Sequence, residues 1–112
     1  MAVSMVVVAS RPPEWTQEQF TVWWRGEHAD MARRLPGLLA YRHGRVLQDF
    51  DNPGAPAWDG HAVLTFADRE AYDAAMASDE WADAVRHTGK MKGRRMILIT
   101  EDVDLLASAP AA

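Results

Sequence analysis

The spacing of apolar residues predicts four β-strands. Val3–Ala9 is a β-branched run typical of a buried strand, and a proline pair soon after it stops the ladder. The stretch Asp49–Ala57 is rich in Asp, Asn, Pro and Gly, which favour turns. The remaining strands are expected where apolar and polar residues alternate, at Leu38–Gln48, Trp58–Phe66 and Arg94–Glu101.

A helix is predicted from about Gln17 to Leu35. Thr16 and Gln19 have the spacing of a capping box, in which each side chain satisfies an early backbone donor. Pro36-Gly37 ends the helical pattern. At about 100° per residue, four apolar side chains fall on one stripe of this helix: Phe20, Trp24, Met31 and Leu35.

A second helical region is predicted between the last two strands. Asp68 is a suitable N-cap for a helix over Arg69–Ala77, and Ser78 can restart the helix through Arg86. The element order is therefore β-α-β-β-α-β.

This order predicts an α+β, ferredoxin-like fold, with a four-stranded antiparallel sheet and both helices on one face. The other sheet face would then expose apolar groups, so we expect two copies to pair face to face as a homodimeric α+β barrel. A cavity between sheet and first helix, or between the two sheets, is the natural place for a ligand. We expect one domain over residues 1–105 and a frayed tail over 106–112.

Composition narrows the class of protein. The chain has 112 residues, no cysteine and a formal charge of −4, so it has room for one core and no disulfide. The negative charge argues against a general nucleic-acid binder. The longest apolar run, Met5–Ala9, is too short to span a membrane and lacks the preceding basic residues of a signal peptide. We therefore expect a cytoplasmic protein without membrane or nucleic-acid partners.

Two residues are candidates for catalysis. His28 lies one helical turn beyond Trp24, where an imidazole with an unperturbed pKa of about 6.5 could both take and give a proton. Tyr41, on the following strand, could donate a hydrogen bond to a developing oxyanion. Structural roles compete with both interpretations: a histidine bonded to a carbonyl, and a tyrosine packed in the core.

Other residues are candidates for contact with a substrate. Trp24 and Phe20 could form an aromatic pocket wall, although core packing alone also explains them. His43 shares a strand face with Tyr41, and His61 is expected on a neighbouring strand; an exposed position without a role is the alternative for both histidines. Asp59 could orient a histidine or cap a turn, and the turn is favoured because Gly60 follows it.

Cofactor and metal sites are not expected. The chain has no His-x-His or His-x3-His pair, and it lacks the glycine patterns of nucleotide-binding loops. The stretch Arg86–Arg95 holds five Lys or Arg residues among ten, and is either a solvated loop or a site for a carboxylate or phosphate.

The sequence resembles the EthD family of the dimeric α+β barrel superfamily. The residues that carry the resemblance run from the first helix to the third strand: Phe20, Trp24, His28, Pro36-Gly37, Tyr41, Trp58-Asp59-Gly60 and Leu64-Thr65-Phe66. Similar proteins often have an aspartate and a phenylalanine-containing loop before the last strand, where this chain has Arg86–Lys92. The resemblance implies a homodimer without cofactor, in a superfamily of isomerases, cyclases, decarboxylases and oxygenases.

The resulting hypothesis is a small cofactor-independent enzyme that transfers protons on a hydrophobic cyclic, aromatic or polyketide-like substrate. Isomerisation, cyclisation and decarboxylation share an enolate-type first step, and the sequence does not separate them. Two alternatives stay open. One is a cofactor-free monooxygenase of the same superfamily, and the other is a barrel that binds a hydrophobic ligand without changing it.

Overall fold

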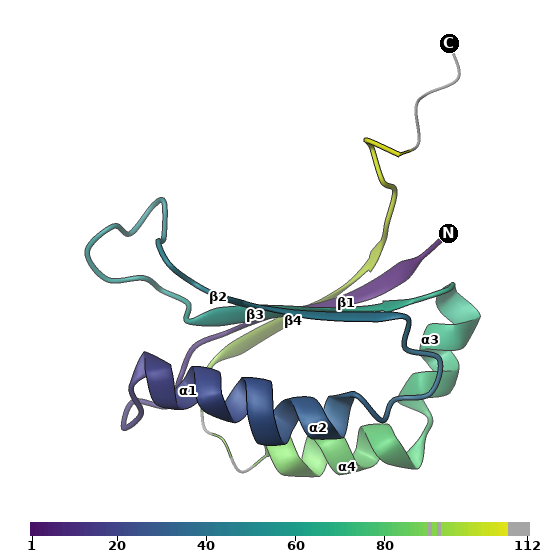
Figure 1. The fold of residues 1–112 in the computed structure, drawn as a ribbon, viewed down its shortest axis with the longest axis horizontal. Coiled ribbons are helices and arrows are strands. Elements are labelled where there is room, and N and C mark those ends of the chain that lie inside the picture. Colours follow the sequence, from purple (N-terminus) through teal and green to yellow (C-terminus); the bar gives the residue numbers. More distant parts are fainter. Residues whose placement is uncertain (90, 92, 108–112) are drawn as a thin grey trace.

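The computed structural model describes residues 1–89, 91 and 93–107. Its elements form one sheet with all the helices on one face of it (Figure 1). In chain order they are β1 (Val3–Ala9), α1 (Gln17–Trp23), the π-helical turn η1 (Trp24–His28), α2 (Ala29–Ala32), β2 (Ala40–Arg45), β3 (Gly60–Phe66), α3 (Arg69–Met76), α4 (Asp79–Thr88) and β4 (Arg95–Glu101).

The sheet confirms the predicted ferredoxin-like fold. Its strand order is β2-β3-β1-β4, and every neighbouring pair is antiparallel. β1 lies in the middle, so that Val7 pairs with Ala62 of β3 on one side and with Ile97 of β4 on the other. The strands β2 and β4 therefore form the two edges.

The first helix differs from its prediction in the middle and at its end. Thr16 and Gln19 form the expected capping box. The segment Trp24–His28, however, is a π-helical turn, and the regular helix ends at Ala32 rather than at Leu35. Gly26 lies in this turn, and a glycine weakens an α-helix from within. Beyond the helix, Gly37 adopts a φ of 76°, which turns the chain toward β2.

The second helical region is confirmed as two short helices. The side chains of Asp68 and Ser78 accept hydrogen bonds from the backbone N–H groups of Ala71 and Trp81, as expected for N-caps. The helix α4 extends two residues beyond the predicted end, to Thr88. No helix in the described part of the chain is long and apolar enough to cross a lipid bilayer.

The strands next to the long loop are shorter than predicted. β2 ends at Arg45 rather than Gln48, and β3 begins at Gly60 rather than Trp58. The loop between them is organised by the carboxylate of Asp49, which accepts hydrogen bonds from the backbone of three later residues: Asp51, Asn52 and Ala57. These bonds give the loop backbone partners other than a strand.

The C-terminal tail forms local hydrogen bonds at Asp104. Of the tail predicted to fray, Leu106 and Ala107 donate backbone hydrogen bonds to Asp104. Residues 108–112 lie outside the described residues.

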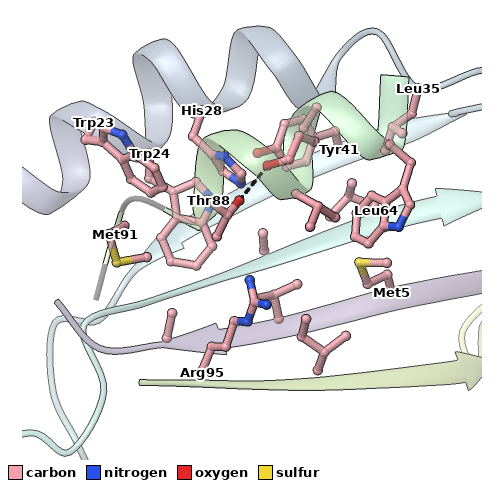
Figure 2. Close-up of a pocket in the computed structure, with 18 of the residues that line it drawn as sticks. Met5, Trp23, Trp24, His28, Leu35, Tyr41, Leu64, Thr88, Met91 and Arg95 are labelled. Atoms are coloured by element: carbon pink, nitrogen blue, oxygen red, sulfur yellow. Dashed lines mark hydrogen bonds between the residues drawn. The ribbon is translucent and has the colours of Figure 1, made fainter. Parts of the chain in front are cut away.

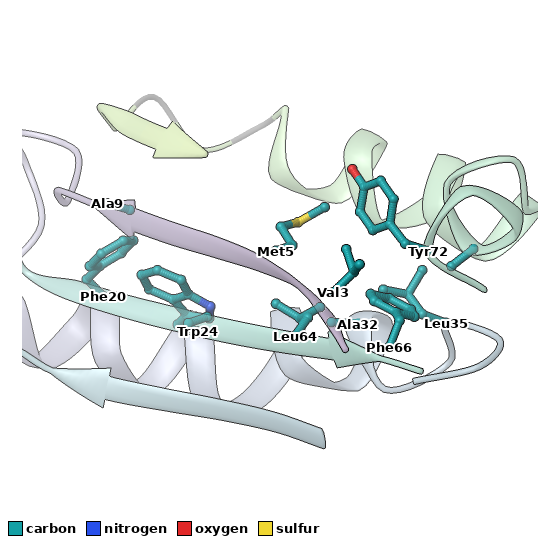
Figure 3. Close-up of a cluster of buried hydrophobic side chains, with 12 residues drawn as sticks. Val3, Met5, Ala9, Phe20, Trp24, Ala32, Leu35, Leu64, Phe66 and Tyr72 are labelled. Carbon is teal, nitrogen blue, oxygen red and sulfur yellow. The ribbon is translucent and has the colours of Figure 1, made fainter. Parts of the chain in front are cut away.

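The hydrophobic core fills the space between the helices and the sheet (Figure 3). Phe20 of α1 is 1% exposed and Phe66 of β3 is fully buried. The ring of Phe66 meets that of Tyr72 from α3 edge to face, with centroids 5.7 Å apart. Apolar burial of this kind is the main favourable contribution to folding.

The opposite face of the sheet has no helix over it. The alternation of the strands places Val6, Val8, Val63 and Leu98 there, and Leu98 is 50% exposed. Apolar side chains thus lie on both faces of the sheet, while the described helices cover one of them (Figure 1).

Replacing Phe66 by Ala should lower the free energy of unfolding by about 3–5 kcal/mol, because it empties the core beside Tyr72. Urea unfolding followed by circular dichroism measures the change. Val22→Ala, at a side chain that is 66% exposed on α1, serves as the control and should change stability by less than about 0.5 kcal/mol. Equal costs for the two variants would contradict this description of the core.

Candidate active site

A cavity of about 90 Å³ lies between the helices and the sheet. That volume is several times what a single water molecule needs. The cavity is lined mainly by apolar and aromatic side chains. Ten of the lining residues are labelled in Figure 2: Met5, Trp23, Trp24, His28, Leu35, Tyr41, Leu64, Thr88, Met91 and Arg95.

Apart from the indoles, the polar side chains on the described cavity wall are those of His28, Tyr41, Thr88 and Arg95. The hydroxyl of Thr88 donates a hydrogen bond of 2.8 Å to the carbonyl oxygen of Ala84, one turn earlier in α4 (Figure 2). The side chains of His28, Tyr41 and Arg95 carry the remaining polar groups that a ligand could meet.

The π-helical turn decides which side chain His28 contacts. In an α-helix, residues five apart point about 140° away from each other. In a π-helical turn the hydrogen bonds join residues five apart, which brings them onto the same side. Accordingly, the rings of Trp23 and His28 are stacked at 4.8 Å with an interplanar angle of 11°. Trp24, the expected neighbour of His28, is at 6.4 Å and tilted by 67°.

A second histidine completes this stack from another helix. The ring of His87 in α4 is parallel to that of Trp23 at 5.4 Å and lies 5.7 Å from that of His28. The Nδ1 atoms of His28 and His87 are both buried, and neither has a hydrogen-bond partner among the described residues. A buried polar atom of this kind is costly unless something satisfies it.

The surroundings of His28 keep its imidazole neutral. Three causes together lower the pKa of His28 to about 4: burial is the largest, and the nearness of His87 and of the Arg95 guanidinium adds to it. At neutral pH the ring therefore has a free lone pair on one nitrogen, and it can accept a proton or a hydrogen bond.

Tyr41 faces the same cavity from β2. Burial raises the pKa of Tyr41 above its usual 10.0, while the neighbouring Trp24 side chain and the Arg33 charge work in the opposite direction. The phenol therefore stays protonated near neutral pH and is available as a hydrogen-bond donor.

His43 lies behind Trp24, outside the cavity lining. Its ring meets the indole of Trp24 edge to face at 4.6 Å. Its Nδ1 accepts a hydrogen bond of 2.9 Å from Nε of Arg25. Burial, followed by the charges of Arg25 and His61, lowers the pKa of His43 to about 4. The position of His43 thus suits it to support Trp24 rather than to touch a ligand in this cavity.

Asp59 and His61 are not brought to the cavity. The carboxylate of Asp59 accepts a hydrogen bond of 2.8 Å from the backbone N–H of Arg11 and pairs with the Arg11 guanidinium. It thereby fixes the chain that leaves β1. His61 alternates with the buried residues of β3, so it is on the opposite sheet face, where its ring covers Gly44.

The histidines do not converge on a common point. His28 and His87 share the ring stack, His43 lies behind Trp24, and His61 is on the far face of the sheet. Within the described ranges, no three His, Asp or Glu side chains are grouped as metal ligands.

The basic stretch before β4 separates into different environments. Arg86 pairs with Asp83 on the outer side of α4, and the guanidinium of Arg94 lies 4.2 Å from the ring centroid of Trp58. Arg95, by contrast, lines the cavity. Lys90 and Lys92 lie outside the described residues.

Sequence comparison identifies the family. The family model of the EthD domain matches residues 12–91, well over half of the chain. The chain belongs to the EthD family. No curated protein sequence matches it.

Solved structures share the fold of this EthD protein. An ethyl tert-butyl ether D family protein from Bacillus halodurans has a TM-score of 0.76 at 20% identity, covering 92% of this chain and 100% of its own. A dimeric ferredoxin-like protein of unknown function from Thermobifida fusca has a TM-score of 0.68 at 15% identity, with coverages of 91% and 92%. SnoaB, a cofactor-independent oxygenase from Streptomyces nogalater, has a TM-score of 0.67 at 12% identity, with coverages of 94% and 96%.

Several residues at the candidate site of this EthD protein were missed by the sequence reasoning. The face of α4 that lines the cavity has helical spacing, with Trp81, Val85 and Thr88 at intervals of four and three residues, and this signal was available. The stacking of Trp23 on His28 had no such signal, because it depends on the π-helical turn.

The imidazoles of His28 and His43 should remain neutral until the pH falls to about 4. Because the unfolded chain binds these protons near pH 6.5, the stability due to the two neutral rings should be complete above pH 6.5 and decrease as the pH falls toward 4. Proton–carbon NMR of the ring C–H groups, assigned with His28→Gln and His43→Gln, measures both midpoints. A midpoint near 6.5 for His28 would show that its ring is hydrated.

Proposed function

We propose that this EthD protein is a small cofactor-independent enzyme that catalyses proton transfer on a hydrophobic cyclic, aromatic or polyketide-like substrate. The observation that carries the proposal is the state of His28: a neutral imidazole on a cavity wall, with a buried Nδ1 that has no partner in the described part of the chain. A general base must be unprotonated at the working pH and must have a lone pair that no other group occupies.

In the proposed reaction, His28 removes a proton from the carbon next to a substrate carbonyl. The electron pair of the broken C–H bond moves to the carbonyl oxygen and forms an enolate. The hydroxyl of Tyr41, which faces the same cavity and stays protonated, donates a hydrogen bond to that oxygen. The imidazolium then returns the proton to carbon, at the same or another position.

The rings around the cavity would hold a flat substrate. Trp23 is stacked on His28, and Trp24 packs against Phe20 with centroids 5.3 Å apart, so the walls beside the base are aromatic. Offset or edge contacts with such rings favour aromatic and alicyclic ligands.

A cofactor-independent oxygenase is the second candidate function. It is supported by the fold shared with SnoaB, which is such an enzyme. An enolate formed by His28 could be consumed by dioxygen rather than by a proton, so the two candidates differ in the second step. Dioxygen consumption separates them.

Solvent-deuterium exchange into 2-tetralone, a bicyclic ketone with acidic protons next to its carbonyl, tests the proposal. The wild-type protein should accelerate exchange at these positions, measured by NMR in D₂O near neutral pD. His28→Gln should lower the catalysed rate by a factor of about 100 or more, because glutamine cannot exchange protons in this range. An oxygen electrode in the same reaction detects the oxygenase.

His61→Gln is the matched control, since His61 lies on the opposite face of the sheet from the cavity. Its exchange rate should stay within about twofold of the wild type, because His61 does not line the cavity. Since His61 lies on the sheet face proposed to pair with a second copy, sedimentation equilibrium should confirm that the variant keeps the assembly of the wild type. A His28→Gln variant that exchanges deuterium at the wild-type rate would show that His28 is not the base. If neither the wild type nor any variant accelerates exchange into 2-tetralone, the enzymatic proposal is contradicted. The alternative of a barrel that binds a hydrophobic ligand without changing it then stands.

We also propose that the bare sheet face is covered by a second copy of the chain. The face carries apolar side chains, among them Val6, Val63 and the half-exposed Leu98. Its strands present the same residues in each copy, so a twofold pairing buries them symmetrically. The dimeric Thermobifida fusca protein with this fold supports the assembly.

Leu98→Asp should convert the dimer into a monomer of 12.5 kDa, because it places a charge among the apolar side chains of this face. Sedimentation equilibrium at micromolar concentration measures the mass. Val22→Asp, on the outer surface of α1, is the control and should sediment as the wild type does. A monomeric wild type would refute the assembly.

A further inference from the structure

Arg95 introduces a positive charge into an apolar cavity. It is the first residue of β4, and the register pairs it with Ala9 of β1. The small side chain of Ala9 leaves space beside it on the face toward the helices. In Figure 2 the Arg95 side chain rises from the strand toward the helix that carries His28. Arg95 itself is exposed, since β4 is a sheet edge, so solvent reaches the guanidinium until a ligand arrives.

Within the described residues, six of the other nine arginines have side-chain partners; Arg34, Arg42 and Arg45 have none, but they do not line the cavity. Four form ion pairs with aspartates: Arg11, Arg33, Arg69 and Arg86. Arg25 donates to His43, and Arg94 donates to the carbonyl oxygen of Ala57. For Arg95, no ion pair or side-chain hydrogen bond is formed within the described residues.

The described wall of the cavity also contains no carboxylate. A negatively charged ligand would therefore meet attraction at Arg95 without repulsion from the wall. A guanidinium binds a carboxylate through two parallel hydrogen bonds, and these are among the stronger polar contacts in proteins. The aromatic walls formed by Trp23 and Trp24 suit the other end of such a ligand.

We propose that the cavity binds an aromatic or alicyclic molecule that carries a carboxylate, and that Arg95 binds the carboxylate. This inference rests on the proposed function only in placing the ligand in the same cavity; it does not depend on proton transfer. Arg95 is then the residue that distinguishes acids from neutral molecules of the same shape.

A bound carboxylate would also act on His28. The Arg95 guanidinium is one of the charges that hold the pKa of His28 low. A carboxylate on Arg95 offsets that charge, so binding should raise the pKa of His28 and make the imidazole a stronger base. By raising the pKa of His28, an acidic ligand would increase the basicity of the residue proposed to take its proton.

Calorimetric titration with 2-naphthoate and its neutral counterpart 2-naphthalenemethanol tests this inference. The wild-type protein should bind 2-naphthoate at least about tenfold more tightly than the alcohol, as expected for hydrogen bonds to a charged group. Arg95→Gln should abolish this preference and leave the affinity for the alcohol within about twofold. Arg95→Lys, which keeps the charge and loses the paired geometry, should retain part of the preference.

Arg69→Gln is the matched control, because it removes the same charge from the surface of α3, where Arg69 pairs with Asp73. It should keep the full preference for 2-naphthoate. An Arg95→Gln variant that still prefers the acid would overturn the inference, as would a wild type that binds neither probe or binds both equally.

The NMR titration of His28 supplies a second readout. In the wild type, saturating 2-naphthoate should raise the His28 midpoint, and in Arg95→Gln it should have little effect. Both measurements concern binding alone. A preference that depends on Arg95, without any exchange of 2-tetralone, would refute the enzymatic proposal and leave this inference standing.

Discussion

The packing of Trp24 against β3 is the contact on which the candidate site depends. Gly60 at the start of β3 has no side chain, and a Cβ there would come within 3.2 Å of both the Trp24 ring and Nε2 of His43. The indole, 4% exposed, can therefore lie close against the strand. With Phe20 packed beside it, this contact sets the height of the helix above the sheet. The cavity is the space left along the same helix, where Ala62 and Leu64 face it from β3.

Burial sets the protonation states of the titratable side chains that line the cavity. Burial works against charge, so it lowers the pKa of His28 and raises that of Tyr41. His28 is left as a neutral acceptor and Tyr41 as a neutral donor, and both line the same cavity. Arg95 adds a guanidinium, which is charged wherever it lies in a protein, and this residue is exposed at a sheet edge. The burial of His28 and Tyr41 thus explains why both side chains are neutral at neutral pH.

The fold also explains why one sheet carries two kinds of surface. Helices cover the face of β1 that holds Val3 and Met5, and those residues are buried. The other face, with Val6 and Val8, is left for another molecule or for solvent (Figure 1). The site lies on the helix-covered side, so the residues proposed to hold a ligand and those proposed to meet a second chain occupy different faces. Substitutions on the helix-covered face should therefore affect ligand binding, and substitutions on the bare face should affect assembly.

The sequence by itself determined the elements, their order, the helix caps and the aromatic stripe, because these depend on local spacing and on residues close in the chain. It also indicated His28 and Tyr41, whose side chains both line the cavity. The tertiary structure alone decided the rest. The π-helical turn placed His28 on Trp23, the packing of α4 brought His87 to them, and the register of β4 brought in Arg95. Asp59 and His61 were expected at the site and do not line the cavity. Asp59 binds the backbone of Arg11, just after β1, and the alternation of β3 places His61 on the opposite sheet face. Contacts between distant segments depend on strand register and on helix phase. A shift of one residue in the register of a strand or in the phase of a helix changes which side chains meet.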